Sequence, residues 1–169
     1  SNAYDAKGLL IRAIRDNNPV IFIEHRLLYY TDAFVPEDLY EVPFGVAKTV
    51  REGSDITIVG VSNMLVECLR AQELLAEIGI SAEVIDPVSL APLDTETIAA
   101  SASRTGNLLV VDNAWTNCGA SAEIMASVME RTDQPIKARR LGYAPTTCPT
   151  TPVLEDHFYP NPVTIAQSA

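Results

Sequence analysis

One stretch of the chain, residues 55–86, constrains the fold more than any other. It contains two short runs rich in β-branched residues, at 55–60 and 80–86, and each is typical of a buried strand. The segment between them has apolar residues at alternating steps of four and three, which predicts an amphipathic helix. These residues are Met64, Cys68, Ala71, Leu75 and Ile78.

The expected ends of this helix support the same interpretation. Ser62 is suited to cap the first turn, and Gly79 can adopt the left-handed conformation that terminates helices. A strand, a helix and a second strand with short joins imply a right-handed crossover and a parallel sheet. We therefore expect an α/β fold of three layers, with a mostly parallel sheet and helices on both faces.

The alternation of helices and strands continues on both sides of this unit. We expect helices at 5–16, 95–105 and 120–131, and strands at 20–24, 108–111 and 136–141. Asp5 is the expected cap of the first helix, Asp94 or Thr95 caps the second, and Gly106 ends it. Residues 25–43 have no clear period and predict a connection, with a domain boundary near Gly45. Five prolines after Gly142 predict little regular structure there.

Composition excludes several classes of protein. With 47% hydrophobic and 20% charged residues the chain is an ordinary globular sequence, and the absence of a signal peptide or long apolar run predicts a cytoplasmic protein without a membrane span. The net charge of −10 argues against nucleic acid, because phosphate binding needs clustered Lys and Arg. Cys68, Cys118 and Cys148 lack the spacing of a disulfide framework or a zinc site.

Four features could indicate a functional site, but for each of them a structural explanation is simpler than a functional one. The loop after the first strand of the central unit holds Gly60 alone rather than a dinucleotide-binding glycine motif. Cys118 precedes a helix, where a thiol can be activated, but a small apolar residue at a helix start explains it better. His25 beside Glu24, and His157 near the end, are better explained as structural histidines than as catalytic ones.

A fifth candidate lies at the end of the first helix. The free carbonyls of Ala13 and Ile14 carry the negative end of the helix dipole, and Asp16 and Asn18 follow them. Oxygen ligands of this kind suit a hard cation. A plain helix stop with Asn turn residues explains the same pattern.

Several segments together resemble the beta subunit of thiamine diphosphate-dependent 2-oxo acid dehydrogenases, the decarboxylating first components of the pyruvate and branched-chain complexes. The resemblance covers residues 4–165. Its clearest pieces are residues 5–10, 14–19, 22–25 with 28–29, 51–55, 83–86, 92–94, Trp115 with Gly119, and 122–124. Their order and spacing make the match specific.

The resemblance implies a division of the chain. Residues 4–45 would be the end of a pyrimidine-binding domain with a linker, and residues 46–169 a transketolase-type C-terminal domain. Residues 1–3 have, by their own sequence, the pattern of a cloning scar. Thiamine diphosphate and magnesium would serve the longer enzyme, whose catalytic groups lie outside this chain, so the chain alone should be inactive. The implied partners are the alpha subunit, a second beta subunit and the acyltransferase component.

The resemblance also implies a potassium site at Ala13, Ile14, Asp16 and Asn18, with a further ligand from outside the chain, so potassium should bind weakly or not at all here. Val88, Ala91 and Ala144 replace charged residues of many relatives, which weakens the case for a conventional multienzyme complex and leaves the 2-oxo acid open. Two alternatives remain open. One is the C-terminal domain of a transketolase or deoxyxylulose-phosphate synthase, and the other is a non-catalytic assembly module.

Overall fold

The structure is a computed structural model that describes residues 1–169. Its helices are α1 (Ala3–Arg15), the 3₁₀ helix η1 (Arg26–Tyr30), α2 (Met64–Glu77), α3 (Thr95–Thr105), α4 (Ala120–Met129), α5 (Pro152–Phe158) and α6 (Pro162–Ser168). Its strands are β1 (Lys48–Arg51), β2 (Ile56–Gly60), β3 (Ala82–Asp86), β4 (Asn107–Trp115) and β5 (Lys137–Tyr143). None of the helices is long and apolar enough to cross a membrane.

The five strands form one mostly parallel sheet in the order β1-β3-β2-β4-β5. Central strand β2 pairs in parallel with β3 and β4, and its Ile58 lies between Val84 and Leu109. Strand β5 pairs in parallel with β4, and β1 runs antiparallel to β3. The strands predicted from residue 55 onward are confirmed. Strand β1 was missed because its four residues alternate between half-buried and exposed without a continuous apolar run.

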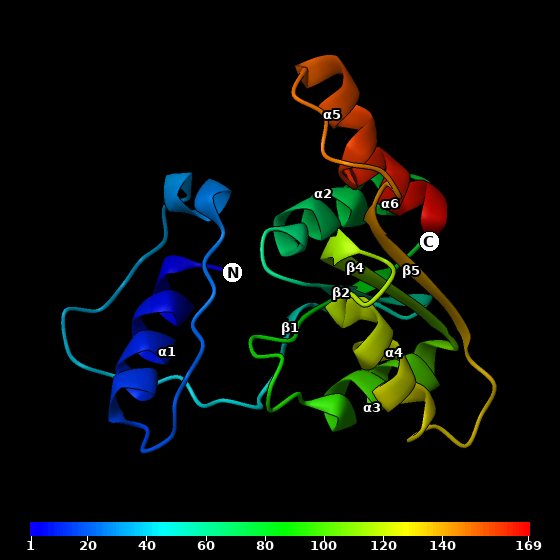
Figure 1. Cartoon of the computed structure of the whole chain (residues 1–169). Coiled ribbons are helices and arrows are strands. Elements are labelled where there is room, and N and C mark those ends of the chain that lie inside the picture. Colours follow the sequence, from blue (N-terminus) through cyan, green and yellow to red (C-terminus); the bar gives the residue numbers. More distant parts are fainter.

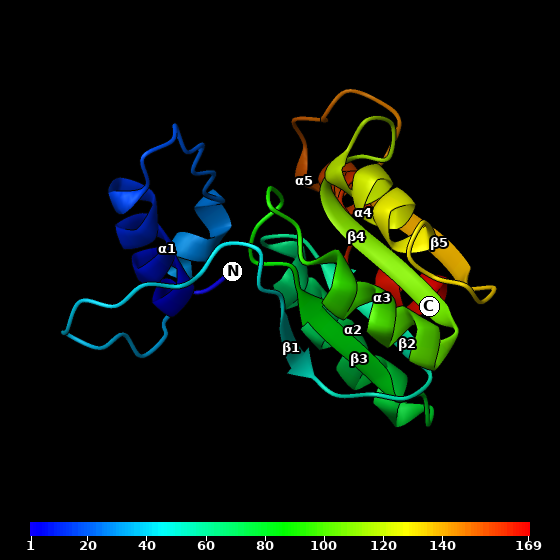
Figure 2. The same ribbon diagram turned by 90° about the horizontal axis from the view of Figure 1, so that it is seen from below.

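Helices cover both faces of the sheet, as the three-layer prediction required. On one face, side chains of α2 and α6 such as Leu75 and Ile165 pack against Ile58 and Val84. On the other, α3 and α4 pack against side chains of β2, β3 and β4. Figure 1 shows α2 and α6 above the sheet, and Figure 2, seen from below, shows α3 and α4 over the opposite face.

Most predicted helix ends are confirmed, with one correction. Gly79 and Gly106 have positive φ angles of 80° and 71°, and the Asp94 side chain accepts a hydrogen bond from the Thr97 N–H as the cap of α3. The prediction that Ser62 caps α2 is wrong. Ser62 has a φ of 56° and lies outside the helix, and the Met64 N–H donates instead to Asn113 Oδ1 of β4. The cap therefore comes from a distant segment, which local spacing does not reveal.

The amino-terminal segment differs from prediction in two ways. Helix α1 begins at Ala3 with Asn2 as its cap, and the buried Asp5, the expected cap, pairs with Lys48 of β1. Residues 20–24, predicted as a strand, form none. The apolar run is present, but a strand needs a neighbouring strand for its backbone hydrogen bonds, and none lies beside this segment in the chain.

The prediction of little regular structure after Gly142 is also wrong, since α5 and α6 form there. Pro152 and Pro162 occupy the first turn of α5 and α6, respectively, where a missing N–H costs nothing. Asn161 caps α6 with a capping box that includes Thr164. Buried Ile165 then anchors α6 against the core beneath α2.

Candidate functional site

The four residues predicted to hold a cation lie together at the end of α1, but two of their oxygens, the Ala13 carbonyl and Asp16 Oδ1, already accept hydrogen bonds. The Ala13 carbonyl accepts a hydrogen bond from the Asp16 N–H at 3.3 Å. Asp16 Oδ1 accepts from the Asn18 N–H and from Asn18 Nδ2, at 2.9 and 3.0 Å. Ile14 is mostly exposed. In this arrangement the Asn18 amide presents a donor to Asp16, so a cation would have to displace it.

Charges around Asp16 shape a hollow between α1 and the sheet domain. The hollow has a volume of about 480 Å³. Arg15 and Arg12 pair with Glu41 at 2.6 and 3.4 Å, and Arg12 also lies 3.9 Å from Asp16. Hydrogen bonds from Asn18 lower the pKa of Asp16, and the hydrogen bond from Arg15 lowers that of Glu41. The hollow is lined by Arg12, Asp16, Glu41, Pro43, Phe44 and Pro92.

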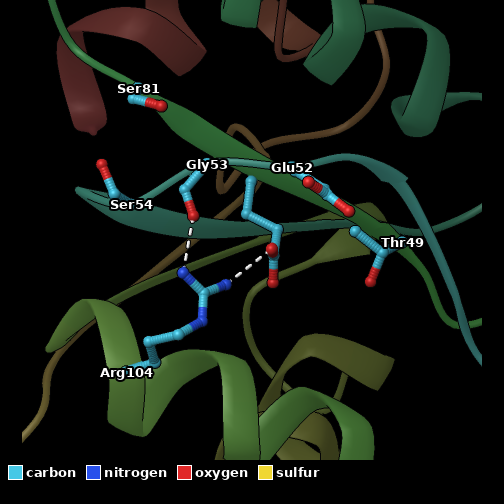
Figure 3. Close-up of a pocket in the computed structure, with 7 residues that line it drawn as sticks. Thr49, Glu52, Gly53, Ser54, Ser81 and Arg104 are labelled. Carbon is cyan, nitrogen blue, oxygen red and sulfur yellow. Dashed lines mark hydrogen bonds and ion pairs between the residues drawn. The ribbon is translucent and has the colours of Figure 1, made fainter.

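A second hollow, of about 530 Å³, lies at the amino ends of β2 and β3, and no hydrophobic residue lines it (Figure 3). Arg104 reaches into it from α3 and donates to the Gly53 carbonyl at 2.7 Å and to Glu83 at 2.6 Å. The buried Glu83 also accepts from Ser101, whose hydroxyl lies 2.6 Å from that of Thr57. These groups satisfy one another, so they brace α3 against the sheet.

The carboxyl ends of the parallel strands, where α/β folds usually bind ligands, hold helix caps instead. Buried Asp112 accepts a hydrogen bond from the Ser121 N–H at 2.9 Å and so caps α4. A side chain at Gly60 would come within 2.7 Å of Leu65 Cα, so this glycine allows α2 to approach β2. Its role is packing, in line with the absence of a dinucleotide motif.

The cysteines and histidines are spread over different segments. Cys118 lies just before the start of α4, as the structural interpretation placed it, but its side chain is exposed and its φ is 59°. Cys68 is buried, and burial raises the pKa of its thiol. His25 accepts a hydrogen bond from the Leu27 N–H at 3.3 Å and caps η1, while Glu24 binds Tyr29 instead. His157 lies in the last turn of α5.

The most prominent surface feature is an apolar segment, residues 20–39, which sequence periodicity did not single out as exposed. Ile21, Ile23, Tyr30 and Phe34 each expose more than four fifths of their surface, at 88, 82, 87 and 85%. So many large apolar side chains in one short stretch mark an interaction surface. The signal in the sequence was the continuous apolar run followed by aromatic residues.

The comparisons with known proteins agree with this architecture. The family described as "Transketolase, C-terminal domain" matches residues 45–165. The chain is 44% identical, over its whole length, to the beta subunit of acetoin:2,6-dichlorophenolindophenol oxidoreductase from Cupriavidus necator, and covers 51% of that protein. It is 40% identical, again over its whole length, to the pyruvate dehydrogenase E1 beta subunit of Bacillus subtilis, and covers 53% of it.

A solved structure shares the fold. It is an inactive beta4 tetramer of a split-gene transketolase, with a TM-score of 0.71 and 26% identity over 82% of this chain and 45% of that one. The chain spans about half the length of the curated relatives it matches. The resemblance to beta subunits of 2-oxo acid dehydrogenases is thus confirmed, and the chain belongs to the transketolase C-terminal domain family.

Proposed function

We propose that the chain is the carboxyl-terminal part of the beta subunit of a thiamine diphosphate-dependent dehydrogenase, and that it serves subunit pairing and docking. The observation that carries this proposal is that the whole of this chain is similar to about half of two beta subunits, one named for acetoin oxidation and one for pyruvate dehydrogenation. Residues 4–45 would end the pyrimidine-binding domain, and residues 46–169 would form the C-terminal domain. The family match at residues 45–165 supports this division.

The exposed apolar segment supports a role in assembly. Its side chains would be covered either by the remainder of the longer protein or by another subunit, such as the alpha subunit or a second beta subunit. The tetrameric structural neighbour is in keeping with pairing of beta subunits. Docking of an acyltransferase component belongs to the same proposal.

Thiamine diphosphate and magnesium would belong to the longer enzyme rather than to this chain. No group of three or more His, Cys, Asp or Glu side chains is placed here to hold a metal ion. When bound, thiamine diphosphate supplies the electron sink for breaking a bond next to a carbonyl. The residues of this chain would support the cofactor's site only by holding subunits together.

Two substrates fit the relatives, and their chemistry is closely related. Pyruvate loses carbon dioxide and acetoin loses acetaldehyde, and each leaves a two-carbon unit that becomes an acetyl group after giving up two electrons. A lipoyl disulfide or an artificial dye can accept those electrons. Acetoin is a specific second candidate, because two acetoin-oxidising relatives are 44 and 43% identical to nearly all of the chain.

The deciding experiment uses the full-length subunit with its alpha partner, thiamine diphosphate, magnesium and an artificial electron acceptor. We expect dye reduction with one member of a panel of 2-oxo acids and acetoin, and none from this chain alone. The alpha partner is omitted in the matched control. Silence across the panel, with both subunits folded and cofactor bound, would instead favour carbon transfer to sugar phosphates or a purely structural role.

A further inference from the structure

Strand β5 carries the clearest feature that the proposed function does not explain. Three of the twelve Lys and Arg residues in a chain of net charge −10 lie within four consecutive positions of this strand. They are Lys137, Arg139 and Arg140, hereafter the basic edge. None of them has a carboxylate within 4.0 Å, whereas Arg12, Arg15, Lys48, Arg70 and Arg104 all do.

The backbone of β5 is also open. The strand is the last in the sheet and pairs only with β4, beyond which Figure 1 shows it lying on the outside. The Lys137 N–H donates to the Gly106 carbonyl, so Lys137 faces β4. Alternate residues of a parallel strand bond to opposite neighbours, and the N–H and C=O groups of Ala138 and Arg140 therefore face outward. Residues 137–140 are all exposed.

The basic side chains flank this open edge on both sides of the sheet. Consecutive strand residues point to opposite faces, so Lys137 and Arg139 share one face and Arg140 takes the other. Arg139 donates only to the Ser168 carbonyl at 3.3 Å, and Arg140 only to the Thr116 carbonyl at 2.7 Å. A single bond leaves most of each guanidinium's five N–H donors available for a carboxylate.

We propose that the basic edge of β5 is a docking site for an acidic, extended polypeptide segment of a partner protein, which adds to the sheet as a further strand. Strand addition uses the outward N–H and C=O groups for affinity, and side-chain complementarity provides selectivity. Acidic side chains on the added strand would neutralise Lys137, Arg139 and Arg140. The proposal is independent of the reaction that the longer protein catalyses.

Charge decides between this partner and two others. Charged residues on an edge strand discourage pairing with a copy of the same strand, since Lys and Arg would then face Lys and Arg. A second β5 is therefore disfavoured. Nucleic acid is disfavoured as well, because the remainder of the chain carries a large net negative charge. An acidic polypeptide meets both the charge and the hydrogen-bonding pattern.

The test measures binding of labelled peptides to the whole chain by fluorescence anisotropy. The probe is the seven-residue peptide Val-Glu-Glu-Val-Glu-Glu-Val, which matches β5 in length and presents glutamate on both faces of the added strand, and its control has lysine in place of glutamate. We expect the acidic peptide alone to bind, and Arg139→Gln or Arg140→Gln to weaken its binding by about threefold each. Arg51→Gln, on the opposite edge strand β1, is the matched control and should change nothing.

N-methylation of the peptide separates strand addition from simple charge attraction. An added edge strand directs alternate N–H groups toward the sheet, so methylating one alternate set should abolish binding and methylating the other should not. The double variant Arg139→Glu with Arg140→Glu should prefer the lysine peptide. Equal binding of both peptides, tolerance of both methylation patterns, binding of a single-stranded oligonucleotide in their place, or no peptide binding would overturn the proposal.

Discussion

At the scale of single residues, the Glu83–Arg104 pair shows how a buried charge is held in this fold. Glu83 is 6% exposed within the central part of the sheet, and its carboxylate is bound by Arg104 and Ser101. A buried carboxylate that loses its cation keeps its desolvation penalty without compensation. The pair therefore matters less for the attraction it provides than for the cost that would appear if one partner were removed.

This reasoning predicts the effect of Arg104→Met. We expect the free energy of unfolding to fall by about 2 kcal/mol, less than for a fully buried pair, because the Arg104 side chain is 51% exposed. Arg70→Met is the matched control, since it breaks a surface pair with Glu67 and should change stability by less than about 0.5 kcal/mol. Denaturant unfolding measures both. Equal losses of stability in the two variants would contradict the conclusion that the Glu83–Arg104 pair holds α3 against the sheet.

Residue patterns predicted the ends of elements well where the cause was local. Gly79 and Gly106 take the left-handed conformation expected of them, and Asp94 caps α3. Patterns failed where the partner is far along the chain. Asn113 accepts the hydrogen bond at the start of α2 that was expected to go to Ser62. Asp5, the expected cap of α1, forms an ion pair with Lys48 instead. The Glu83–Arg104 brace was missed for the same reason, because 21 positions separate its members.

At the scale of elements, the cap of α3 also fixes the start of β1. Asp94 accepts hydrogen bonds from the Ala47 N–H at 2.9 Å and from the N–H and hydroxyl of Thr97 at 3.1 and 2.7 Å. Partial burial alone would raise the pKa of Asp94, but these hydrogen bonds to the charged form outweigh it and lower the pKa. One carboxylate thus joins the helix and the edge strand.

The lowered pKa sets the pH dependence of Asp94→Ala. A carboxyl whose pKa is lower in the folded state stabilises the fold above its unfolded pKa, and this contribution is lost as pH falls through the folded pKa. We expect Asp94→Ala to lower the free energy of unfolding by about 2 kcal/mol at pH 7, and by less at about pH 3. Asn161→Ala, which removes the uncharged cap of α6, should cost a similar amount at both pH values. If unfolding titrations showed the same loss of stability for Asp94→Ala at both pH values, the ionised Asp94 carboxylate would not be the stabilising form.

Strands were predicted correctly where this chain also supplies the neighbouring strands with which they pair. Strands β2, β3 and β4 read as buried runs, and they are buried between two helical layers. Residues 20–24 carry the same signal but have no neighbouring strand here, so they remain irregular and mostly exposed. Prolines misled the prediction in the opposite direction, because Pro152 and Pro162 begin helices rather than break them.

At the scale of the whole molecule, the chain holds a five-stranded sheet covered by helices beside a segment, residues 20–39, with exposed apolar side chains. The proposed potassium site lies just before that segment, at the end of α1. Two of its oxygens already accept hydrogen bonds within the site, since the Asp16 N–H donates to the Ala13 carbonyl and Asn18 donates to Asp16 Oδ1. A cation ligand from outside the chain would be needed to make potassium binding outweigh these hydrogen bonds.

We therefore expect potassium chloride, compared with choline chloride at equal ionic strength, to leave the Tm of this chain unchanged and to raise that of the full-length subunit. At a potassium concentration tenfold above Kd, the gain would be about 1.4 kcal/mol. Asp16→Ala in the longer subunit should remove the difference, whereas Asp133→Ala, on an exposed turn, should retain it. If potassium left the Tm of both proteins unchanged, the helix end would be a simple stop signal, because only a bound cation links the Tm to potassium rather than to ionic strength.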